Sequence, residues 1–328
     1  MITVVIPTRN RAQLLAAALH SLVTQTLPKH SFEVLIIDNG STDGTAEVVQ
    51  DNVSAMTNLR YCFEPEPGLH AGRHRGMLEA RGDLLVFADD DIEAMPSWLA
   101  TLAEVFKDPD VAMVGGNNRP MFMESPPAWL MSLWSRRHQL GGRALPALSI
   151  LELDGPARAI SPYNVWGCNF AIRKQVLLKA GGFHPDGMPR ELIRFRGDGE
   201  THVSRFVAES SMKCLFHPGA SVYHKITKGR MTIDYFRQRG FNQGVSDSYT
   251  RLRQQDTPTR GSRSWPYRVG RWGWQMLKAS RASLIMPADE RRALQAIRVG
   301  HKEGFAYHQN AYWSDPELRE WVHRERYF

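Results

Sequence analysis

The sequence predicts an α/β protein built around a mostly parallel sheet. Over its first 115 residues, short apolar runs alternate with amphipathic stretches that are long enough to form helices. The runs are almost continuously apolar, as in strands that helices cover on both faces. A chain of 328 residues with 42% hydrophobic and 23% charged residues has the composition of an ordinary globular protein, which excludes disordered, collagen-like and coiled-coil chains.

The elements of this first part follow in regular order. The expected strands cover residues 2–6, 32–38, 59–63, 84–88 and 112–115, and the expected helices cover residues 12–22, 45–53, 71–81 and 96–106. Ligands in parallel sheets bind beyond the carboxyl ends of the strands. That rule directs attention to four segments that follow strands: 7–11, 38–43, 68–75 and 89–91.

The rest of the chain divides into two parts. Residues 117–162 carry paired prolines and glycines without a clean period, so we expect an irregular segment with one short helix there. A strand over 164–172, helices from Lys174 and over 198–210, and strands over 213–216 and 220–224 complete a first domain, residues 1–225, with halves 1–115 and 116–225. Beyond it we expect a helical extension, residues 226–328, with helices over 231–252, 266–283, 288–309 and 315–325.

Nothing in the sequence indicates export or a membrane span. The apolar runs fall far short of the roughly 18 residues that span a bilayer, and the first residues lack the basic region and cleavage site of a signal peptide. The three cysteines, Cys62, Cys168 and Cys214, are too few and too scattered for a disulfide framework or a zinc site. We therefore expect a cytoplasmic protein.

The net charge of +7 belongs to the last third of the chain. Residues 1–224 hold 21 Lys and Arg against 24 Asp and Glu, whereas residues 225–328 hold 20 against 10. This asymmetry fits an anionic partner, such as lipid headgroups at the inner face of the membrane, as well as it fits a solvated basic surface.

Aromatic residues and arginines are interleaved in this basic part, among them Trp265, Trp272 and Arg268. They fit a peripheral membrane helix beside a lipid-linked acceptor, or helices packed on the first domain or on a second subunit of a homo-oligomer. No recognisable nucleic-acid module accompanies them, so we expect no nucleic-acid partner.

Three consecutive carboxylates, Asp89, Asp90 and Asp91, follow the apolar run 84–88. Their mutual repulsion at the end of a buried strand favours a hard divalent cation such as Mg²⁺ or Mn²⁺. The alternative is that Asp91 caps the next helix. The position at a strand end favours the metal.

Other strand ends carry weaker signals. A carboxylate at Asp38 can accept an imide N–H or bind a ribose hydroxyl, and Arg73 at the start of a helix favours an anion such as a diphosphate. In the segment 197–200, one of two carboxylates, Asp198 or Glu200, can remove a proton from a hydroxyl while the other positions it. Taken alone, the segments after Pro7 and Asp38 and the segment 197–200 are explained better by helix capping than by a binding or catalytic role.

In combination these motifs resemble the family 2 glycosyltransferases over residues 1–225, in order and approximate spacing. The resemblance implies a GT-A fold, which is Rossmann-like with a mostly parallel central sheet flanked by helices. It also implies a nucleotide-diphosphate sugar donor, a divalent metal at a DXD element and inversion at the anomeric carbon. The motifs are VVIPTRNR at 4–11, DNGSTDG at 38–44, GRHRG at 72–76, DDD at 89–91 and GDGE at 197–200.

The resemblance also assigns roles to residues. It implies that Asp91 is the main metal ligand, helped by Asp89 and by His224, although a packed core histidine explains His224 nearly as well. It makes Asp198 the general base and Glu200 the second acidic position. The remaining implied residues bind the nucleotide-sugar (Pro7, Thr8, Arg9, Arg11, Asp38, Asn39, Arg73, Asp89 and Asp90) or form the acceptor side of the donor pocket (Trp166, Gly167 and Asn169).

Two positions depart from the family pattern: His74 stands where asparagine is frequent, and Gly197 where glutamate is frequent. The signature of processive synthases is not evident, so we expect one transfer per encounter. We predict a metal-dependent, inverting hexosyltransferase that favours a UDP-sugar. The acceptor remains open among polysaccharide, lipid-linked intermediate, small metabolite and protein.

Two alternative functions remain. A sugar-phosphate nucleotidyltransferase usually needs a glycine-rich loop after the first strand, and residues 7–11 contain no glycine. The second alternative is a non-catalytic protein that binds nucleotide-sugars. The presence of both Asp91 and Asp198 argues against it, because binding alone does not need both carboxylates. A donor-hydrolysis assay separates the second alternative from an enzyme.

Overall fold

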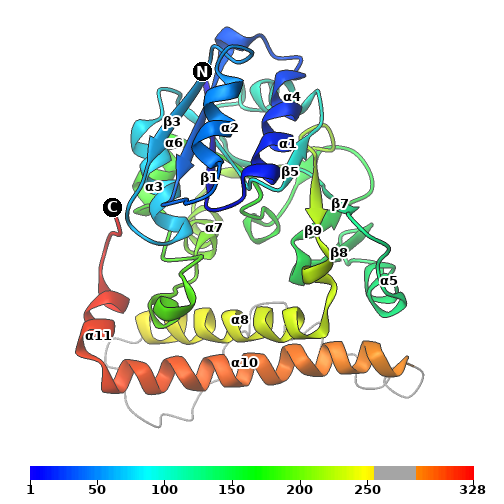
Figure 1. Cartoon of the computed structure of the whole chain (residues 1–328), viewed down its shortest axis with the longest axis vertical. Helices are drawn as coiled ribbons and strands as arrows, with labels where there is room; N and C mark the ends of the chain where they lie inside the picture. The colour runs from blue at the N-terminus through cyan, green and yellow to red at the C-terminus, as the bar shows by residue number, and fades with distance from the viewer. Residues whose placement is uncertain (255–285) are drawn as a thin grey trace.

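The computed structural model describes residues 1–254 and 286–328. A large α/β part lies above a pair of long helices (Figure 1). Its main sheet has eight strands in the order β10-β12-β6-β11-β4-β1-β2-β3. These strands are β1 Ile2–Thr8, β2 Phe32–Asp38, β3 Leu59–Phe63, β4 Leu84–Ala88, β6 Val111–Gly115, β10 Arg158–Ala159, β11 Asn169–Arg173 and β12 Lys213–Phe216.

The sheet is mostly parallel, as expected. β1 pairs in parallel with both β2 and β4, β2 with β3, and β12 with β6. Only β11, which is antiparallel to β4 and β6, and β10 at the edge run the other way. β11 begins later than the predicted strand over 164–172, because the chain forms a 3-10 turn over Pro162–Asn164 before it.

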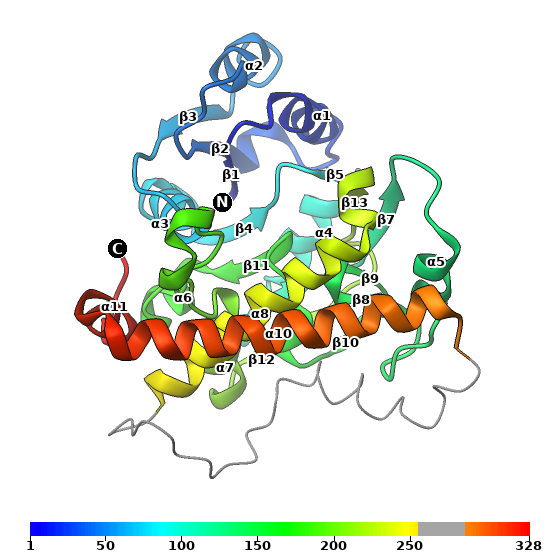
Figure 2. The same ribbon diagram turned by 60° about the horizontal axis from the view of Figure 1, so that its bottom comes forward.

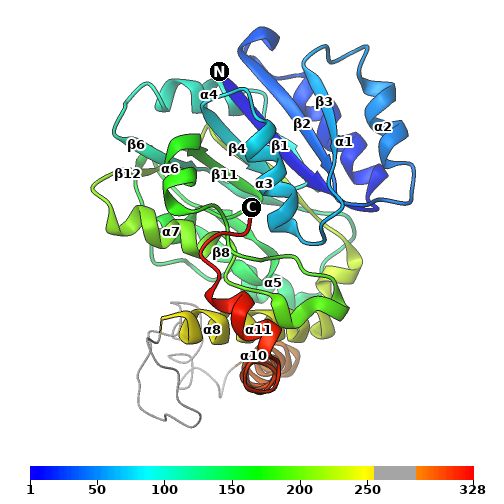
Figure 3. The ribbon, with the colours of Figure 1, turned by 90° about the vertical axis from the view of Figure 1, so that its left-hand side faces the viewer.

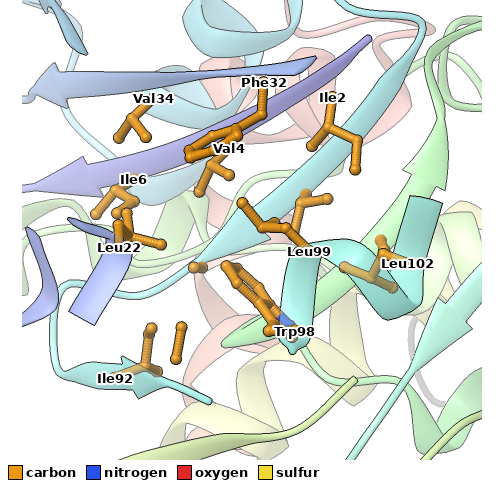
Figure 4. Packing of buried hydrophobic residues seen from close by; sticks show 14 of the residues in the cluster. Ile2, Val4, Ile6, Leu22, Phe32, Val34, Ile92, Trp98, Leu99 and Leu102 are labelled. Carbon is orange, nitrogen blue, oxygen red and sulfur yellow. The ribbon is translucent and has the colours of Figure 1, made fainter. Parts of the chain in front are cut away.

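Helices cover the main sheet on both faces. Alternate residues of β1 face opposite sides: Val4 joins the cluster that contains Trp98, and Val5 joins the cluster that contains Met77. Figure 4 shows the first cluster, where Trp98 and Leu99 pack under the strands. Its helices are α1 Ala12–Val23, α2 Thr45–Asn52 and α4 Trp98–Val105, and those of the other face are α3 Leu69–Glu79, α6 Lys174–Ala180 and α7 Glu200–Glu209.

The expectation of an irregular segment over 117–162 was wrong. Three of its stretches pair with two strands from elsewhere in a second, five-stranded sheet of order β5-β13-β7-β9-β8. The individual strands are short, and β7 contains Pro120, so no local period marks them. Helix α5 Ala128–Trp134 is the one short helix expected there, and the strands are β5 Ile92–Ala94, β7 Asn118–Phe122, β8 Arg143–Leu145, β9 Ile150–Glu152 and β13 Val222–Ile226.

The C-terminal part is helical, as expected. Helices α8 Ile233–Arg253 and α10 Ala288–Ser314 lie side by side beneath the sheets (Figures 1 and 2), and α11 Pro316–His323 follows. The chain end then passes close to α3 (Figure 3), where His74 Nδ1 lies 3.2 Å from the Tyr327 carbonyl oxygen. The predicted helix over 266–283, with most of the interleaved aromatic residues and arginines, lies outside the described residues.

Glycines allow the two long helices to touch backbone to backbone. A Cβ on Gly240 or Gly244 of α8 would lie 2.2 or 2.1 Å from the carbonyl oxygen of Ile297 or His301 of α10. Gly300 and Gly304 of α10 approach α8 in the same way. Within the described parts of the chain, no helix has both the length and the apolarity needed to cross a membrane.

Candidate active site

The predicted polar segments meet at one edge of the main sheet. Because β1 and β2 are parallel and in register, Thr8 and Asp38 lie opposite each other where these strands end. β4 ends on the other side of β1, immediately before Asp89. β13 from the second sheet pairs with β5, which places His224 opposite Ile92 and next to the acidic triplet.

The three carboxylates of the triplet take different partners. Asp90 accepts a hydrogen bond from the Thr8 hydroxyl at 2.7 Å and forms an ion pair with Arg11. Burial raises the pKa of Asp90 to about 7, although Arg11 opposes the shift. The Asp91 Oδ2 atom pairs with Arg11 at 3.1 Å and with Arg230 at 3.0 Å, and Asp89 lies 3.9 Å from Arg73. The triplet therefore separates into one structural and two site-facing carboxylates.

Asp89, Asp91 and His224 form a possible metal site, with ligand atoms that all lie within 4.8 Å of one another. The His224 Nδ1 atom lies 3.3 Å from the Ser149 carbonyl oxygen. A carbonyl can only accept, so Nδ1 carries a hydrogen. The Arg230 guanidinium can only donate, and its Nη1 atom lies 3.1 Å from Nε2, so in this contact Nε2 presents its lone pair. That lone pair lies 3.1 Å from Asp91 Oδ1, a buried oxygen with no hydrogen-bond partner among residues 1–254 and 286–328. Two facing electron-pair donors fit a shared cation.

Arg73 connects the metal side of the site to the start of α7. Its guanidinium is 3% exposed and lies 3.9 Å from Asp89 and 3.5 Å from Glu200. The ring of Phe183 lies beneath it, 5.1 Å from the Arg73 Cζ atom. Gly167 makes room for it, because a Cβ there would lie 2.2 Å from Arg73 Nη2. The structure thus brings Arg73, Gly167 and Glu200 together, as the sequence suggested.

Asp198 is a buried carboxylate whose two oxygens both have hydrogen-bond partners. Its side chain is 4% exposed, and both oxygens are engaged: Oδ1 by His184 at 2.6 Å, and Oδ2 by Arg205 at 3.2 Å and by the Thr250 hydroxyl at 2.8 Å. Burial opposes ionisation, but His184, Arg205 and Thr250 together hold the pKa of Asp198 far below its usual value. A saturated carboxylate with a low pKa is a weak proton acceptor.

Glu200, in contrast, opens toward the site. Its side chain is 28% exposed, its Oε1 atom accepts from the Gly167 backbone N–H at 3.4 Å, and its Oε2 atom faces Arg73. It is the first residue of α7, where the helix N-terminus favours the carboxylate form. Glu200 is therefore the more exposed of the two carboxylates in the segment 197–200.

The residues expected at the nucleoside lie at the same edge of the main sheet, but they differ in burial and in hydrogen-bond partners. Asp38 is buried, and Tyr61 donates to its Oδ2 atom at 2.8 Å, while burial and this contact raise the pKa of Tyr61 to about 12. Asn39 is committed to the backbone after β3, since its amide donates to the carbonyls of Glu64 and Glu66. Arg9 is exposed.

Pro7 and the segment 166–169 also have defined packing. Pro7 packs against α3 at Gly72, where an added Cβ would lie 3.0 Å away. Asn169 is buried and accepts from Trp98 Nε1 at 3.0 Å while it donates to the Ala220 carbonyl at 2.9 Å, so it connects the start of β11 to helix α4 and to the segment before β13. Trp166 is half-buried and donates to the Tyr163 carbonyl at 3.3 Å.

Sequence reasoning missed several residues that reach the site from the C-terminal part. Arg230 comes from a 3-10 turn, Lys228–Met231, and Thr250 comes from α8. The high Arg content after residue 225 was the only available signal for Arg230. Nothing local marks Thr250, which is one hydroxyl in a long helix.

Comparisons with known proteins agree with this geometry. Residues 3–179, more than half of the chain, match the family model described as glycosyl transferase family 2. The glycosyltransferase AglE of Haloferax volcanii is 36% identical over 117 residues, which are 35% of this chain and 38% of that protein. The chain thus aligns with well under half of that relative's length.

Two further matches extend over more of the chain. The glucosyl-dolichyl phosphate glucuronosyltransferase of the same organism is 22% identical over 252 residues, 72% of each chain. A mannosyltransferase from Pyrobaculum calidifontis, solved with GDP-mannose and Mn²⁺, is similar in structure over 99% of this chain and 83% of its own. Its TM-score is 0.54 and its sequence identity 18%, so it shows the fold, a GT-A architecture.

Proposed function

This chain belongs to glycosyl transferase family 2, and on that premise we propose that it transfers a sugar from a nucleotide-diphosphate donor to a hydroxyl acceptor, with inversion at the anomeric carbon. The transfer is non-processive and metal-dependent. The observation that carries the proposal is the position of Arg73, between the Asp89 side of the metal site and Glu200. In this proposal the Arg73 guanidinium lies between the leaving diphosphate, on the Asp89 side, and the acceptor hydroxyl that loses its proton, on the Glu200 side.

Asp89, Asp91 and His224 would hold the divalent cation, Mg²⁺ or Mn²⁺, because oxygen ligands and one imidazole suit either ion. When bound there, the cation supplies Lewis acidity that neutralises charge on the departing diphosphate. The Mn²⁺ bound to the archaeal mannosyltransferase of the same fold supports this choice. Arg73 adds a buried positive charge on the same side, where the low dielectric strengthens its effect.

Glu200 removes the proton from the acceptor hydroxyl in this proposal, instead of Asp198. Glu200 is the more exposed carboxylate and lies on the Arg73 side of α7. Asp198 holds His184, Arg205 and Thr250 together behind it, and so fixes the start of the helix that carries Glu200. Trp166 and Gly167 form the adjoining wall of the donor pocket.

The donor nucleotide binds over the ends of β1 and β2, with Asp38, Thr8, Arg9 and Arg11 at its edge. A uridine donor remains the favoured choice, because a carboxylate such as Asp38 can accept the imide N–H of uracil. GDP-mannose, the ligand of the archaeal mannosyltransferase, is the competing donor. A panel of UDP- and GDP-sugars in a thermal-shift screen with Mn²⁺ separates the two, since only a bound nucleotide raises the melting temperature.

The acceptor in this proposal is lipid-linked. The glucuronosyltransferase relative is named for a glucosyl-dolichyl phosphate, and the last third of this chain is basic, which suits the anionic surface that carries such lipids. Flotation with anionic and neutral liposomes tests this part. If the protein stays in the vesicle-free fraction to the same extent with both kinds of liposome, the membrane association is contradicted. The proposed transfer reaction does not depend on this result.

Donor turnover with and without EDTA tests the central proposal. We expect turnover of the donor in Mn²⁺ or Mg²⁺ and its loss in EDTA, with recovery on addition of excess metal. Asp91→Asn should abolish it, whereas Asp110→Asn, which removes an exposed carboxylate at 69% side-chain exposure, should not. Donor turnover that persists in EDTA and in the Asp91→Asn variant would contradict the metal-dependent mechanism.

A further inference from the structure

Arg230 stands at the position that a cation shared by Asp91 and His224 would take. Its Nη1 atom lies 3.0 Å from Asp91 Oδ2 and 3.1 Å from His224 Nε2. The second terminal nitrogen, Nη2, donates to the Leu148 carbonyl at 3.2 Å, and the Tyr235 ring lies 5.7 Å from Cζ. The guanidinium therefore bridges one oxygen and one nitrogen of the same metal site.

Electrostatics explains why a positive group belongs at this point. The Nδ1 hydrogen of His224 is directed toward the Ser149 carbonyl, and Nε2 accepts from Arg230, so the Nε2 lone pair also lies 3.1 Å from the Asp91 Oδ1 atom. Two electron-rich atoms at that separation repel each other unless a positive charge lies beside both. Arg230 Nη1 supplies a donor and that charge in the structure.

A metal ion would use the same His224 nitrogen and the same carboxylate group of Asp91, at shorter range. Mg²⁺ and Mn²⁺ bind carboxylate oxygen at about 2.1 Å, closer than the 3.0 Å hydrogen bond from Arg230. An ion held by both Asp91 and His224 would need the His224 lone pair to which Arg230 now donates, so the guanidinium and the ion exclude each other. From this geometry we infer that Arg230 is an internal competitor of the divalent cation, an inference that rests on the metal site of the proposed function.

The surroundings of Arg230 suit a residue that can leave this position. Its Nε atom is buried and has no hydrogen-bond partner in the described parts of the chain, so the arrangement does not satisfy the side chain fully. The residue belongs to a short 3-10 turn, Lys228–Met231, between β13 and α8.

The competition predicts that removing Arg230 strengthens metal binding. The test is an Mn²⁺ titration of the full chain without nucleotide, followed by EPR, for the wild type, Arg230→Ala and Arg230→Gln. We expect both variants to bind Mn²⁺ about 10-fold more tightly than the wild type, because a site that is occupied by an internal group most of the time binds with reduced apparent affinity. Circular dichroism confirms that each variant is folded.

Lys228→Ala is the matched control, since Lys228 is a cation on the same turn whose side chain is 79% exposed and pairs with Glu124 at 3.3 Å. Removing this screened charge should change Mn²⁺ affinity by less than about threefold. If the Arg230 variants bind Mn²⁺ no better than Lys228→Ala, the competition is refuted while the metal site stands. If neither the wild type nor any variant binds Mn²⁺, the metal site and the competition both fail.

Discussion

Arg73 Nη1 lies 3.5 Å from Glu200 Oε2, although the two residues are separated by 127 positions in the chain. Arg73 belongs to α3 and Glu200 begins α7, so the contact fixes the distance between two helices on the same face of the sheet. It also places the more exposed carboxylate of the segment 197–200 beside a buried cation.

Replacing Glu200 by glutamine should lower kcat by about 10²- to 10⁴-fold, the usual contribution of a general base. Donor affinity should change little, because the amide is nearly isosteric and Arg73 keeps its contact with Asp89. Glu209→Gln, at the exposed far end of the same helix, is the control and should retain full activity. Steady-state kinetics with donor binding by calorimetry make the measurement; an active Glu200→Gln enzyme rules out the assignment.

Asp198→Asn should act mainly on stability. The substitution leaves Arg205 and His184 without the buried carboxylate that pairs with both, and breaking a buried ion pair costs about 3–5 kcal/mol. We expect a loss of this order in the free energy of unfolding, measured by urea denaturation. A variant of wild-type stability with a large loss of kcat would instead return the role of base to Asp198.

Gly167→Ala should displace Arg73, since the new methyl group would lie 2.2 Å from its Nη2 atom. Donor turnover should fall by at least about 10-fold, the equivalent of 1.4 kcal/mol in the transition state, as the guanidinium moves from Asp89 and Glu200. The control is Gly44→Ala, where the nearest atom to an added Cβ lies 3.9 Å away. Equal turnover in the two variants argues that Arg73 has no part in the reaction.

Gly244→Ala should separate the long helices α8 and α10. The added Cβ would lie 2.1 Å from the His301 carbonyl oxygen and 2.7 Å from the Phe305 nitrogen, both backbone atoms. Overpacking of this kind costs about 1–3 kcal/mol, more than alanine gains from its helix propensity, about 1 kcal/mol. Gly229→Ala, with nothing within 4 Å, should melt like the wild type in the same thermal scan; a Gly244→Ala melting temperature that is equal or higher refutes the close packing.

The stability of the chain should fall in mild acid, and His308 should account for part of the slope. Burial lowers the pKa of His308 from 6.5 to about 4, so between these values the unfolded chain binds a proton that the folded chain excludes. The contribution is complete above pH 6.5 and is lost as the pH falls toward 4, at up to about 1.4 kcal/mol per pH unit.

His308→Gln should therefore have a shallower pH dependence of the unfolding free energy, whatever its stability at pH 7. Urea denaturation at pH 7.0, 6.0 and 5.0 gives the slope directly. His20→Gln, which changes an exposed histidine, should keep the wild-type slope. Identical slopes for all three proteins contradict a buried, neutral His308.

The sequence by itself determined the parallel half of the main sheet and the positions of Thr8, Asp38 and Asp89 at its strand ends. A strand that is buried on both faces needs apolar residues at nearly every position, so it is visible as a continuous apolar run. The carboxyl ends of parallel strands lie at the same edge of the sheet. It also determined the helical character of the C-terminal part, because the 3.6-residue period of α8 and α10 is local information.

Only the tertiary structure decided which distant residues complete the site. β7 and β9 lack a period of their own and exist because they pair, β7 with β13 about 100 residues later. Asp198 and Glu200 are equivalent in the sequence, but the fold buries the first beside His184 and opens the second toward Arg73. Arg230 reaches Asp91 across 139 positions. Burial and long-range contact depend on the packing of remote segments, which local sequence patterns do not record.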